Sequence, residues 1–492
     1  MRAAHRGSLF CSERFAQMAT QPAGEHSSLK RTLGPWSLTA MGIGCIIGTG
    51  IFVLTGIASA TRAGPALTIS FVIAGAACAL AALCYAEVSS KIPIAGSAYT
   101  YTYATFGEFF GWIVGWSLAL EYSLAAASVA VGWSAYLATI LRDVAHVAVS
   151  PAWVHSHWDP VQGIVNVPAV AIVALVTMIL VRGTKESSVL NTIVVALKVL
   201  VILLFIAVGA GHINPMNYHL PPGPATHAGG FIPFGWHGIL GGAAFMAFAY
   251  FGFDALSTAA EEARNPRRDV PFAIIASLVA CTVLYLVVVA VLNGMVPFNE
   301  LNVPNAVAFA LDRVGYPWAA SLVSFGAIAG LTTGLLVLMF AQSRVFFAMS
   351  RDGLVPSAFT AIHPVWRTPV FSQVFFGVLI ACAAGLFPIN VIASLANMGT
   401  LVAFIATSLA VPVLRAKRPD IESGFSVPGG PYVIPILSAV ASAGLIYYLQ
   451  AGNPLVWGRV PIVWFGFGVW LAAGLLFYAA YGRRRRARLA YS

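Results

Sequence analysis

The sequence predicts an all-α integral membrane protein with twelve transmembrane helices. Of the 492 residues, 59% are hydrophobic and only 9% are charged, whereas a typical soluble domain has about 25% charged residues. From residue 36 onward, apolar runs long enough to cross a bilayer alternate with short loops. This composition excludes a soluble enzyme, a disordered protein and a nucleic-acid-binding protein, because the chain has too few polar groups to cover a water-exposed surface.

The predicted spans follow one another closely. They cover residues 37–60, 65–88, 107–141, 164–182, 187–211, 235–260, 271–296, 317–347, 370–387, 389–412, 433–450 and 460–481. The third and eighth runs exceed the minimum length, which predicts long, tilted helices. The longest connections, near 143–163, 212–234 and 297–316, contain no globular domain. Residues 1–35 are polar and are neither a signal peptide nor a span, and the start could be Met1 or Met18.

The loop charges predict the orientation. With the N-terminus in the cytoplasm, 22 of the 27 Lys and Arg residues fall in cytoplasmic segments and four fall in outer loops, namely Arg62, Arg142, Arg313 and Arg459. This asymmetry is a strong positive-inside signal. We therefore expect a multi-pass protein of the cell membrane with both termini in the cytoplasm, and the arginine run 483–486 as an anchor at the inner leaflet.

Span one contains an unusual cluster of glycines. Gly42, Gly44, Gly48 and Gly50 fall within nine residues, and each weakens a helix by about 1 kcal/mol relative to alanine. Close packing against another helix would explain one pair, such as Gly44 and Gly48, but it explains residues 48–50 (GTG) poorly. We therefore expect span one to be broken near Gly48.

Span six carries a matching irregularity at residues 248–254 (FAYFGFD), with glycine and Asp254 near mid-membrane. Broken helices expose backbone N–H and C=O groups, which are tolerated at that depth only where they line a cavity or bind something. Paired breaks in corresponding spans point to the binding site of a transporter. A half-helix N-terminus suits a carboxylate and free carbonyls suit an ammonium group, so a zwitterionic α-amino acid is one ligand that would use both.

Lys198 is the one basic residue near the middle of a predicted span. It lies about 16 Å from either end of span five at about 1.5 Å per residue. Inserting a charge at this depth costs about 2.5–3.5 kcal/mol, and burial disfavours the charged form. We expect a proton switch or charged site inside the bundle, or a structural lysine that caps carbonyls of a broken helix. The switch and the cap are compatible roles if loss of the proton from Lys198 releases the capped carbonyls.

Three carboxylates are candidates for gating or contact. For Glu121, in mid-span three, hydrogen bonding to a neighbouring helix explains the residue as well as a proton relay or substrate contact does. Asp254 is expected to hold a gate or to cap the half-helix that follows. Glu261, near the inner end of span six, predicts an inner gate or salt bridge. The sequence has no Ser-His-Asp arrangement, HExxH or Walker loop, so we predict no enzyme, no metal and no cofactor.

Four stretches together resemble the amino acid–polyamine–organocation superfamily, and within it the cationic amino acid transporter branch. They are residues 42–56 (GIGCIIGTGIFVLTG), 248–271 (FAYFGFDALSTAAEEARNPRRDVP), 342–356 (QSRVFFAMSRDGLVP), and Lys198 within its span. The similarity covers residues 30 to 480. A lone GTG would be a weak signal, but this ordered set is specific.

The resemblance implies a five-plus-five inverted repeat followed by two extra helices. The corresponding divisions are a tail at 1–35, a first repeat at 36–211, a second repeat at 212–412, and the last two spans with a basic tail at 413–492. It also implies that a substrate carboxylate meets Gly48, Thr49 and Gly50. The α-ammonium group is implied to meet carbonyls of Ile46, Phe248, Ala249 and Phe251.

The resemblance further implies that Lys198 takes the place of a sodium ion, with Thr332 and Thr333 as its candidate neighbours. Proton coupling is therefore favoured over sodium coupling, although relatives can also act as exchangers. The side-chain pocket is expected near Glu121, Phe253 and Gly330 and is largely apolar. We therefore expect neutral L-amino acids such as alanine as substrates, with arginine and lysine as the alternative. A non-transporting sensor or partner subunit is the competing class of function.

Overall fold

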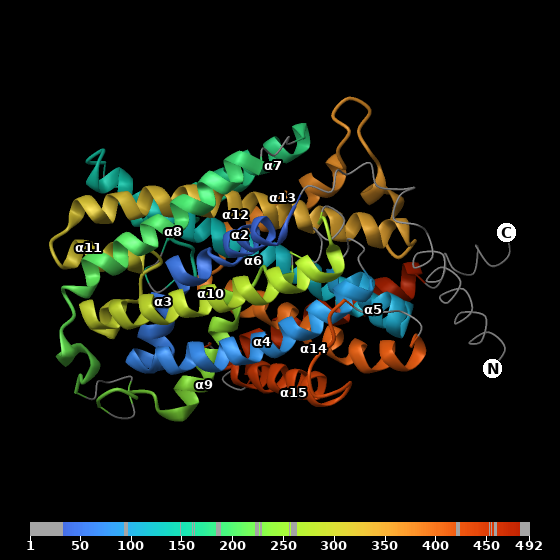
Figure 1. The fold of residues 1–492 in the computed structure, drawn as a ribbon. Coiled ribbons are helices and arrows are strands. Elements are labelled where there is room, and N and C mark those ends of the chain that lie inside the picture. Colours follow the sequence, from blue (N-terminus) through green and yellow to red (C-terminus); the bar gives the residue numbers. More distant parts are fainter. Residues whose placement is uncertain are drawn as a thin grey trace.

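The computed structural model describes residues 33–92, 97–147, 149–159, 161, 163–183, 188–221, 226, 229–254, 256, 263–419, 424–451, 453, 455–456 and 460–482. Nearly all of its regular structure is helical. Figure 1 shows the helices running lengthwise beside one another, with α5 at one end of the molecule and α11 at the opposite end. The ends are named here after these two helices.

Helices occupy every predicted span. The uninterrupted ones are α4 (Leu67–Lys91), α6 (Glu108–Asp143), α7 (Val167–Arg182), α8 (Ser188–Ala210), α10 (Pro266–Met295), α12 (Pro317–Arg351), α13 (Val370–Leu386), α14 (Ile389–Lys417), α15 (Val433–Tyr448) and α16 (Ile462–Phe477). In the described part of the chain, seven helical stretches are long and apolar enough to cross a membrane, and three apolar helices are shorter. The structure is therefore that of a multi-pass membrane protein.

Spans one and six are interrupted, as predicted. The first consists of α2 (Pro35–Ile46), the π-helical turn η1 (Gly50–Leu54), α3 (Thr55–Ala58), and η2 (Ser59–Ala63), after which η3 (Gly64–Ala66) leads into α4. The sixth consists of α9 (Gly235–Met246) and the 3-10 turn η6 (Ala247–Tyr250).

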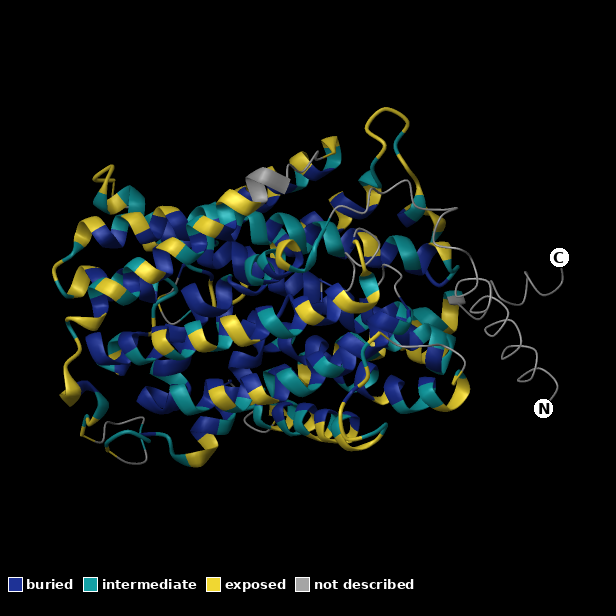
Figure 2. Ribbon diagram, in the orientation of Figure 1, coloured by how far each residue is buried: buried dark blue, intermediate teal, exposed yellow. Residues whose placement is uncertain are grey.

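Apolar residues face outward as well as inward, which is the pattern expected for helices in lipid. Exposed positions follow the outer faces of the helices in Figure 2, while the middle of the molecule is buried. On α8, for example, Leu200 and Leu203 are exposed and Phe205 is fully buried. Proline in the first turn begins α2, α7, α10 and α12, because a first-turn N–H has no partner within the helix.

The helices form two packing groups. In the first group, α4 packs against α9 and α10, and α10 packs against α2. In the second group, α6 packs against α12 and α14, and α7 packs against α13; α14 also contacts α4 of the first group. At the α5 end, Tyr99 donates a hydrogen bond to Asp352 at 2.7 Å, and Lys417 donates to the Thr105 carbonyl at 3.0 Å.

The connections contain short elements that the sequence analysis treated as loops. They include α5 (Ser97–Phe106), α11 (Ala306–Arg313), and the 3-10 turns η4 (Pro151–Trp153), η5 (Pro215–Tyr218), η8 (Phe298–Glu300) and η9 (Ser357–Thr360). The fold is not purely helical, since β1 (Leu455–Val456) and β2 (Val460–Pro461) form an antiparallel hairpin with Leu455 opposite Pro461. The last turn is η10 (Tyr478–Gly482).

The placement of Arg62 in an outer loop was wrong. Arg62 lies in η2 and is 2% exposed. Its guanidinium donates to the Ala451 carbonyl and, at 3.4 Å, to the Ser394 hydroxyl, and it lies over the Phe245 ring at 4.2 Å. These neutral partners explain how a cation is accommodated inside the helix packing.

Candidate functional site

The first break lies between Ile46 and Gly50. Ile47 adopts an extended conformation (φ −71°, ψ 101°), and its N–H still bonds to the Ile43 carbonyl at 2.8 Å. Helical geometry then resumes, with the Phe52 N–H bonded to the Gly48 carbonyl at 3.2 Å. A Cβ atom added to Gly48 would find no atom within 4 Å. The start of the second half-helix therefore faces open space, as the predicted carboxylate position requires.

The second break lies directly beside the first. After η6, Phe251 is extended (φ −53°, ψ 138°) and Gly252 has a φ of +111°, a conformation that side chains other than glycine rarely adopt. A Cβ on Gly252 would lie 2.8 Å from the Cys45 carbonyl oxygen, and one on Gly50 would lie 2.6 Å from the Ala249 Cβ. Glycine at both positions lets the two broken spans cross with their backbones in contact.

Carbonyls from the two breaks converge on one side chain. The Tyr285 hydroxyl of α10 lies 2.8 Å from the Ile46 carbonyl oxygen and 3.1 Å from the Ala249 carbonyl oxygen. Because a hydroxyl has a single proton, it can donate to only one of them at a time. The Phe248 carbonyl accepts from the Phe251 N–H at 3.1 Å. The structure thus brings together two of the four carbonyls expected to meet an ammonium group.

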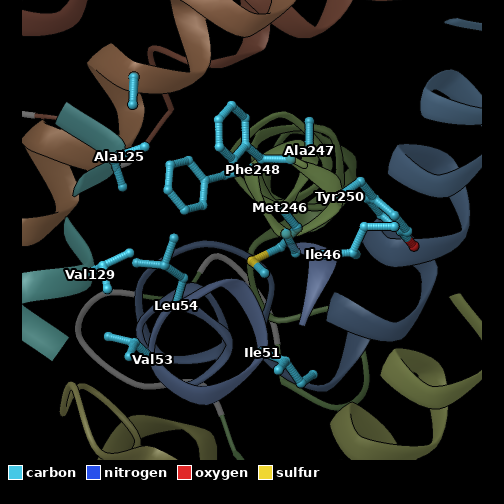
Figure 3. Close-up of a cluster of buried hydrophobic side chains, with 14 of the residues drawn as sticks. Ile46, Ile51, Val53, Leu54, Ala125, Val129, Met246, Ala247, Phe248 and Tyr250 are labelled. Atoms are coloured by element: carbon cyan, nitrogen blue, oxygen red, sulfur yellow. The ribbon is translucent and has the colours of Figure 1, made fainter. Parts of the chain in front are cut away.

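Thr49 supplies the main unsatisfied polar group at the crossing. Its side chain is 3% exposed, and its Oγ1 has no hydrogen-bond partner among the described residues. Buried hydroxyls nearly always have a partner, so such an atom calls for an explanation. Apolar side chains of both broken spans and of α6 gather in one cluster, including those of Ile46, Leu54, Phe248, Ala125 and Val129 (Figure 3).

Lys198 reaches the first break from α8. Its Nζ donates to the Gly44 carbonyl at 2.9 Å, and the residue is 2% exposed. In an uninterrupted helix that carbonyl would accept from the N–H of Gly48, four residues on, so the lysine caps the broken end of α2. The capping hypothesis for Lys198 is confirmed geometrically.

Gly330 of α12 makes room for the Lys198 stem, because a Cβ there would lie 2.8 Å from the Cε and Cγ atoms of Lys198. The predicted neighbours lie close by on the same helix. The Thr333 hydroxyl donates to the Gly330 carbonyl at 2.9 Å, and the Thr332 hydroxyl donates to Ile328 and accepts from Trp133. Their predicted role in proton coupling stays a prediction.

Two buried carboxyl groups lie beyond the breaks. Glu121 is 1% exposed, and its Oε2 has no hydrogen-bond partner among the described residues. Asp254 is 3% exposed, and its Oδ2 accepts from Tyr122 at 3.3 Å and Ser97 at 3.4 Å.

The remaining predicted positions are distributed around this centre. Phe251 packs edge-on to Tyr122 at a centroid separation of 5.7 Å. The Phe253 ring packs between Tyr85 and Phe404, at 5.6 and 5.2 Å, so it faces α4 and α14. Glu261 lies outside the described residues, and its gating role stays a prediction.

The profile of the amino acid permease family matches residues 33–481. The chain belongs to that family. It is 44% identical to the branched-chain amino acid permease BcaP of Bacillus subtilis (strain 168) over 481 residues, which cover 97% of this chain and 98% of the relative.

Two further relatives show the range of names within this family. The chain is 44% identical to the methylthioribose transporter of the same bacterium over 477 residues, covering 97% of this chain and 98% of the relative. It is 39% identical to the vacuolar cationic amino acid transporter 4 of Arabidopsis thaliana, over 81% of this chain and 65% of the relative. The permease is therefore a membrane transporter for amino acids and not an enzyme.

Tyr285 is the part of the site that sequence reasoning missed. A tyrosine in the middle of an apolar run at 271–296 was the available signal, since a buried hydroxyl must find an acceptor. Its partners, however, lie 239 and 36 residues away along the chain. Only the folded arrangement identifies them.

Proposed function

We propose that this permease moves neutral L-amino acids across the cell membrane by alternating access, coupled to protons. The proposed architecture has twelve spans arranged as a five-plus-five inverted repeat with two additional helices, and both termini face the cytoplasm. The observation that carries the proposal is the crossing of the two breaks. There, the open space at Gly48, the unsatisfied Thr49 hydroxyl and the Ile46 and Ala249 carbonyls belong to one site.

These groups match the two charges of an amino acid. The start of the half-helix at Gly48–Gly50 offers N–H groups and positive potential for the α-carboxylate. The Thr49 hydroxyl adds a donor that lacks a partner inside the protein. The carbonyls of Ile46 and Ala249 accept from the α-ammonium, because one hydroxyl cannot satisfy both.

The apolar side chains near the crossing favour a neutral substrate. The resemblance to a branched-chain amino acid permease points the same way. A cationic substrate is the second candidate, because the unpartnered Oε2 of Glu121 is a possible acceptor for an ammonium or guanidinium side chain. Several relatives carry the name cationic amino acid transporter.

Lys198 is the proposed coupling group. When protonated, its ammonium offers three donors to the carbonyls at the broken end of α2, one of which is the Gly44 carbonyl. Loss of the proton weakens this cap and frees the half-helix to move. Proton binding and the position of α2 are thereby linked, without any sodium ion.

Uptake of radiolabelled alanine into proteoliposomes, with unlabelled leucine, arginine and methylthioribose as competitors, tests the substrate proposal. We expect leucine to compete and methylthioribose to have no effect. Uptake of radiolabelled arginine that excess alanine and leucine do not inhibit, together with no uptake of alanine, would overturn the neutral preference. Uptake of radiolabelled methylthioribose without uptake of alanine, leucine or arginine would contradict an amino acid substrate. Tight binding of alanine without flux would favour the sensor.

A further inference from the structure

An ion pair between a buried glutamate and a partly exposed arginine joins the two packing groups at the α5 end of the molecule. Glu87 lies in the last turns of α4, and Arg415 lies in the last turn of α14. The Arg415 Nε lies 2.7 Å from Glu87 Oε1, and its Nη2 lies 2.6 Å from Oε2. This two-pronged arrangement is the strongest geometry for a carboxylate and an arginine. The Glu87 side chain is only 1% exposed.

Further donors hold the same carboxylate. The Val427 N–H donates to Oε2 at 2.8 Å, and the Lys91 Nζ lies 3.7 Å from Oε1. Arg415 also reaches the Val427 carbonyl at 3.4 Å. The segment that leads into α15 is thus tied to both partners. Removing Arg415 leaves the buried Glu87 with only the more distant Lys91 as a counter-charge, and removing the Glu87 charge leaves Arg415 and Lys91 without their shared acceptor.

The two helices joined here belong to different groups. α4 packs against α9 and α10 and follows span one, whereas α14 packs mainly against α6 and also contacts α4 directly. α14 also touches the proposed substrate site near its middle. The Asn397 Nδ2 donates to the Ala244 carbonyl, and a Cβ on Gly399 would lie 2.9 Å from the Glu121 Cβ. At about 1.5 Å per residue, Arg415 lies about 27 Å farther along the same helix than Asn397.

The two packing groups are also joined near the site itself, where Tyr122 of α6 and Ser97 of α5 donate to Asp254. Those hydrogen bonds are longer, at 3.3 and 3.4 Å, than the two between Glu87 and Arg415. The ion pair has shorter distances than these bonds, and it lies at the α5 end of a direct contact between α4 and α14.

We propose that the Glu87–Arg415 ion pair is a latch that keeps the α5 end of the transport path closed and opens when the two packing groups separate. The inference rests on the proposed transport function, under which the α5 end faces the cytoplasm. Glu87 and Arg415 are positioning residues, since neither touches the site at the breaks. The latch sets the balance between the outward-open and inward-open states.

The E87Q variant tests the latch, because glutamine keeps the size of the side chain and removes its charge. Weakening the latch raises the inward-open population. Since apparent affinity falls with the population of the competent state, the external KM is expected to rise at least about fivefold. Accessibility is measured at Cys45, which lies at the end of α2 beside the break, in protein whose other cysteines have been replaced. The reaction of Cys45 with a membrane-impermeant methanethiosulfonate in inside-out vesicles is expected to accelerate at least about fivefold.

Two variants serve as controls. Lys417→Ala removes a neighbouring cation of α14, whose ammonium group donates to the Thr105 carbonyl of α5 and to no described residue of α4. We expect both the external KM and the Cys45 labelling rate to stay within about twofold of the parent protein. Arg415→Lys keeps the charge but loses the two-pronged geometry, and an intermediate effect is expected.

The outcomes separate the two proposals. Amino acid uptake by the parent protein with unchanged Cys45 labelling in both E87Q and Arg415→Lys would overturn the latch and leave the transport function standing. Lower thermal stability with no change in labelling would make the pair a static brace and would also overturn it. Absence of amino acid uptake by the parent protein would overturn the proposed function, whereas faster labelling of E87Q in inside-out vesicles would still support the latch.

Discussion

Replacing Gly50 with alanine tests whether the two broken spans must cross in backbone contact. The added Cβ would lie 2.6 Å from the Ala249 Cβ and closer still to its Cα, whereas ordinary contacts begin at 3.4 Å. The spans must separate by at least the difference, 0.8 Å, and no flexible side chain can yield, because the obstacle is the backbone of η6 and the first atom of its side chain. Overpacking of this kind costs about 1–3 kcal/mol.

The same separation would pull the Ile46 and Ala249 carbonyls away from their common position at Tyr285. A cost of about 1–3 kcal/mol corresponds to about a 5- to 140-fold change in an equilibrium constant. We therefore expect Gly50→Ala to lower both the stability and the affinity for alanine. Thermal unfolding of the purified permease and equilibrium binding of radiolabelled alanine measure the two effects.

Gly48→Ala is the matched control, because it makes the same change two residues away. A Cβ at Gly48 meets no atom within 4 Å, so its effect on stability should stay within about 0.5 kcal/mol. If Gly50→Ala proves as stable as Gly48→Ala and binds alanine as tightly as the parent protein, the close crossing of the broken spans is refuted.

Three other substitutions probe the proposed site. Lys198→Ala removes the cap on the Gly44 carbonyl and is expected to abolish acid-stimulated uptake, measured at external pH 5.5 and 7.5; a full remaining pH response would exclude Lys198 from coupling. Gly48→Leu fills the open space beside Thr49. Equilibrium dialysis should then show alanine binding weakened at least about 100-fold, which corresponds to about 2.8 kcal/mol. Unchanged affinity would mean that the substrate carboxylate binds elsewhere. Glu121→Gln should leave alanine uptake within about threefold of the parent, a change of under 1 kcal/mol, and remove any residual competition by arginine; undiminished arginine competition would rule out Glu121 as its acceptor.

The sequence was most informative about the breaks. Glycine at positions 48 and 50 weakens a helix whatever its surroundings, so the interruption of span one could be predicted locally. That Gly50 crosses Ala249 could not be predicted, because the two residues are 199 positions apart and their contact depends on how η1 and η6 pack. Likewise, the depth of Lys198 predicted a buried function, while its partner Gly44 emerged only from the fold.

Long-range polar pairs account for most of what was missed. Glu87 and Arg415 each end an apolar run, where charges ordinarily face water, and nothing local distinguishes them from solvated residues. Arg62 was misplaced for a related reason, because the apolar run ends just before it although the helix does not. Short elements such as α5 and α11 lack the length and hydrophobicity of a span, so their residues were interpreted as loops.

The most direct test of proton-coupled amino acid transport is uptake of radiolabelled alanine into substrate-free proteoliposomes with an imposed inward proton gradient, with and without sodium. We predict accumulation driven by the proton gradient alone and unchanged by sodium, and loss of that accumulation when the gradient is collapsed. Uptake that requires sodium, or that occurs only into vesicles preloaded with amino acid, would contradict proton symport and leave Lys198 as a structural cap of the first break.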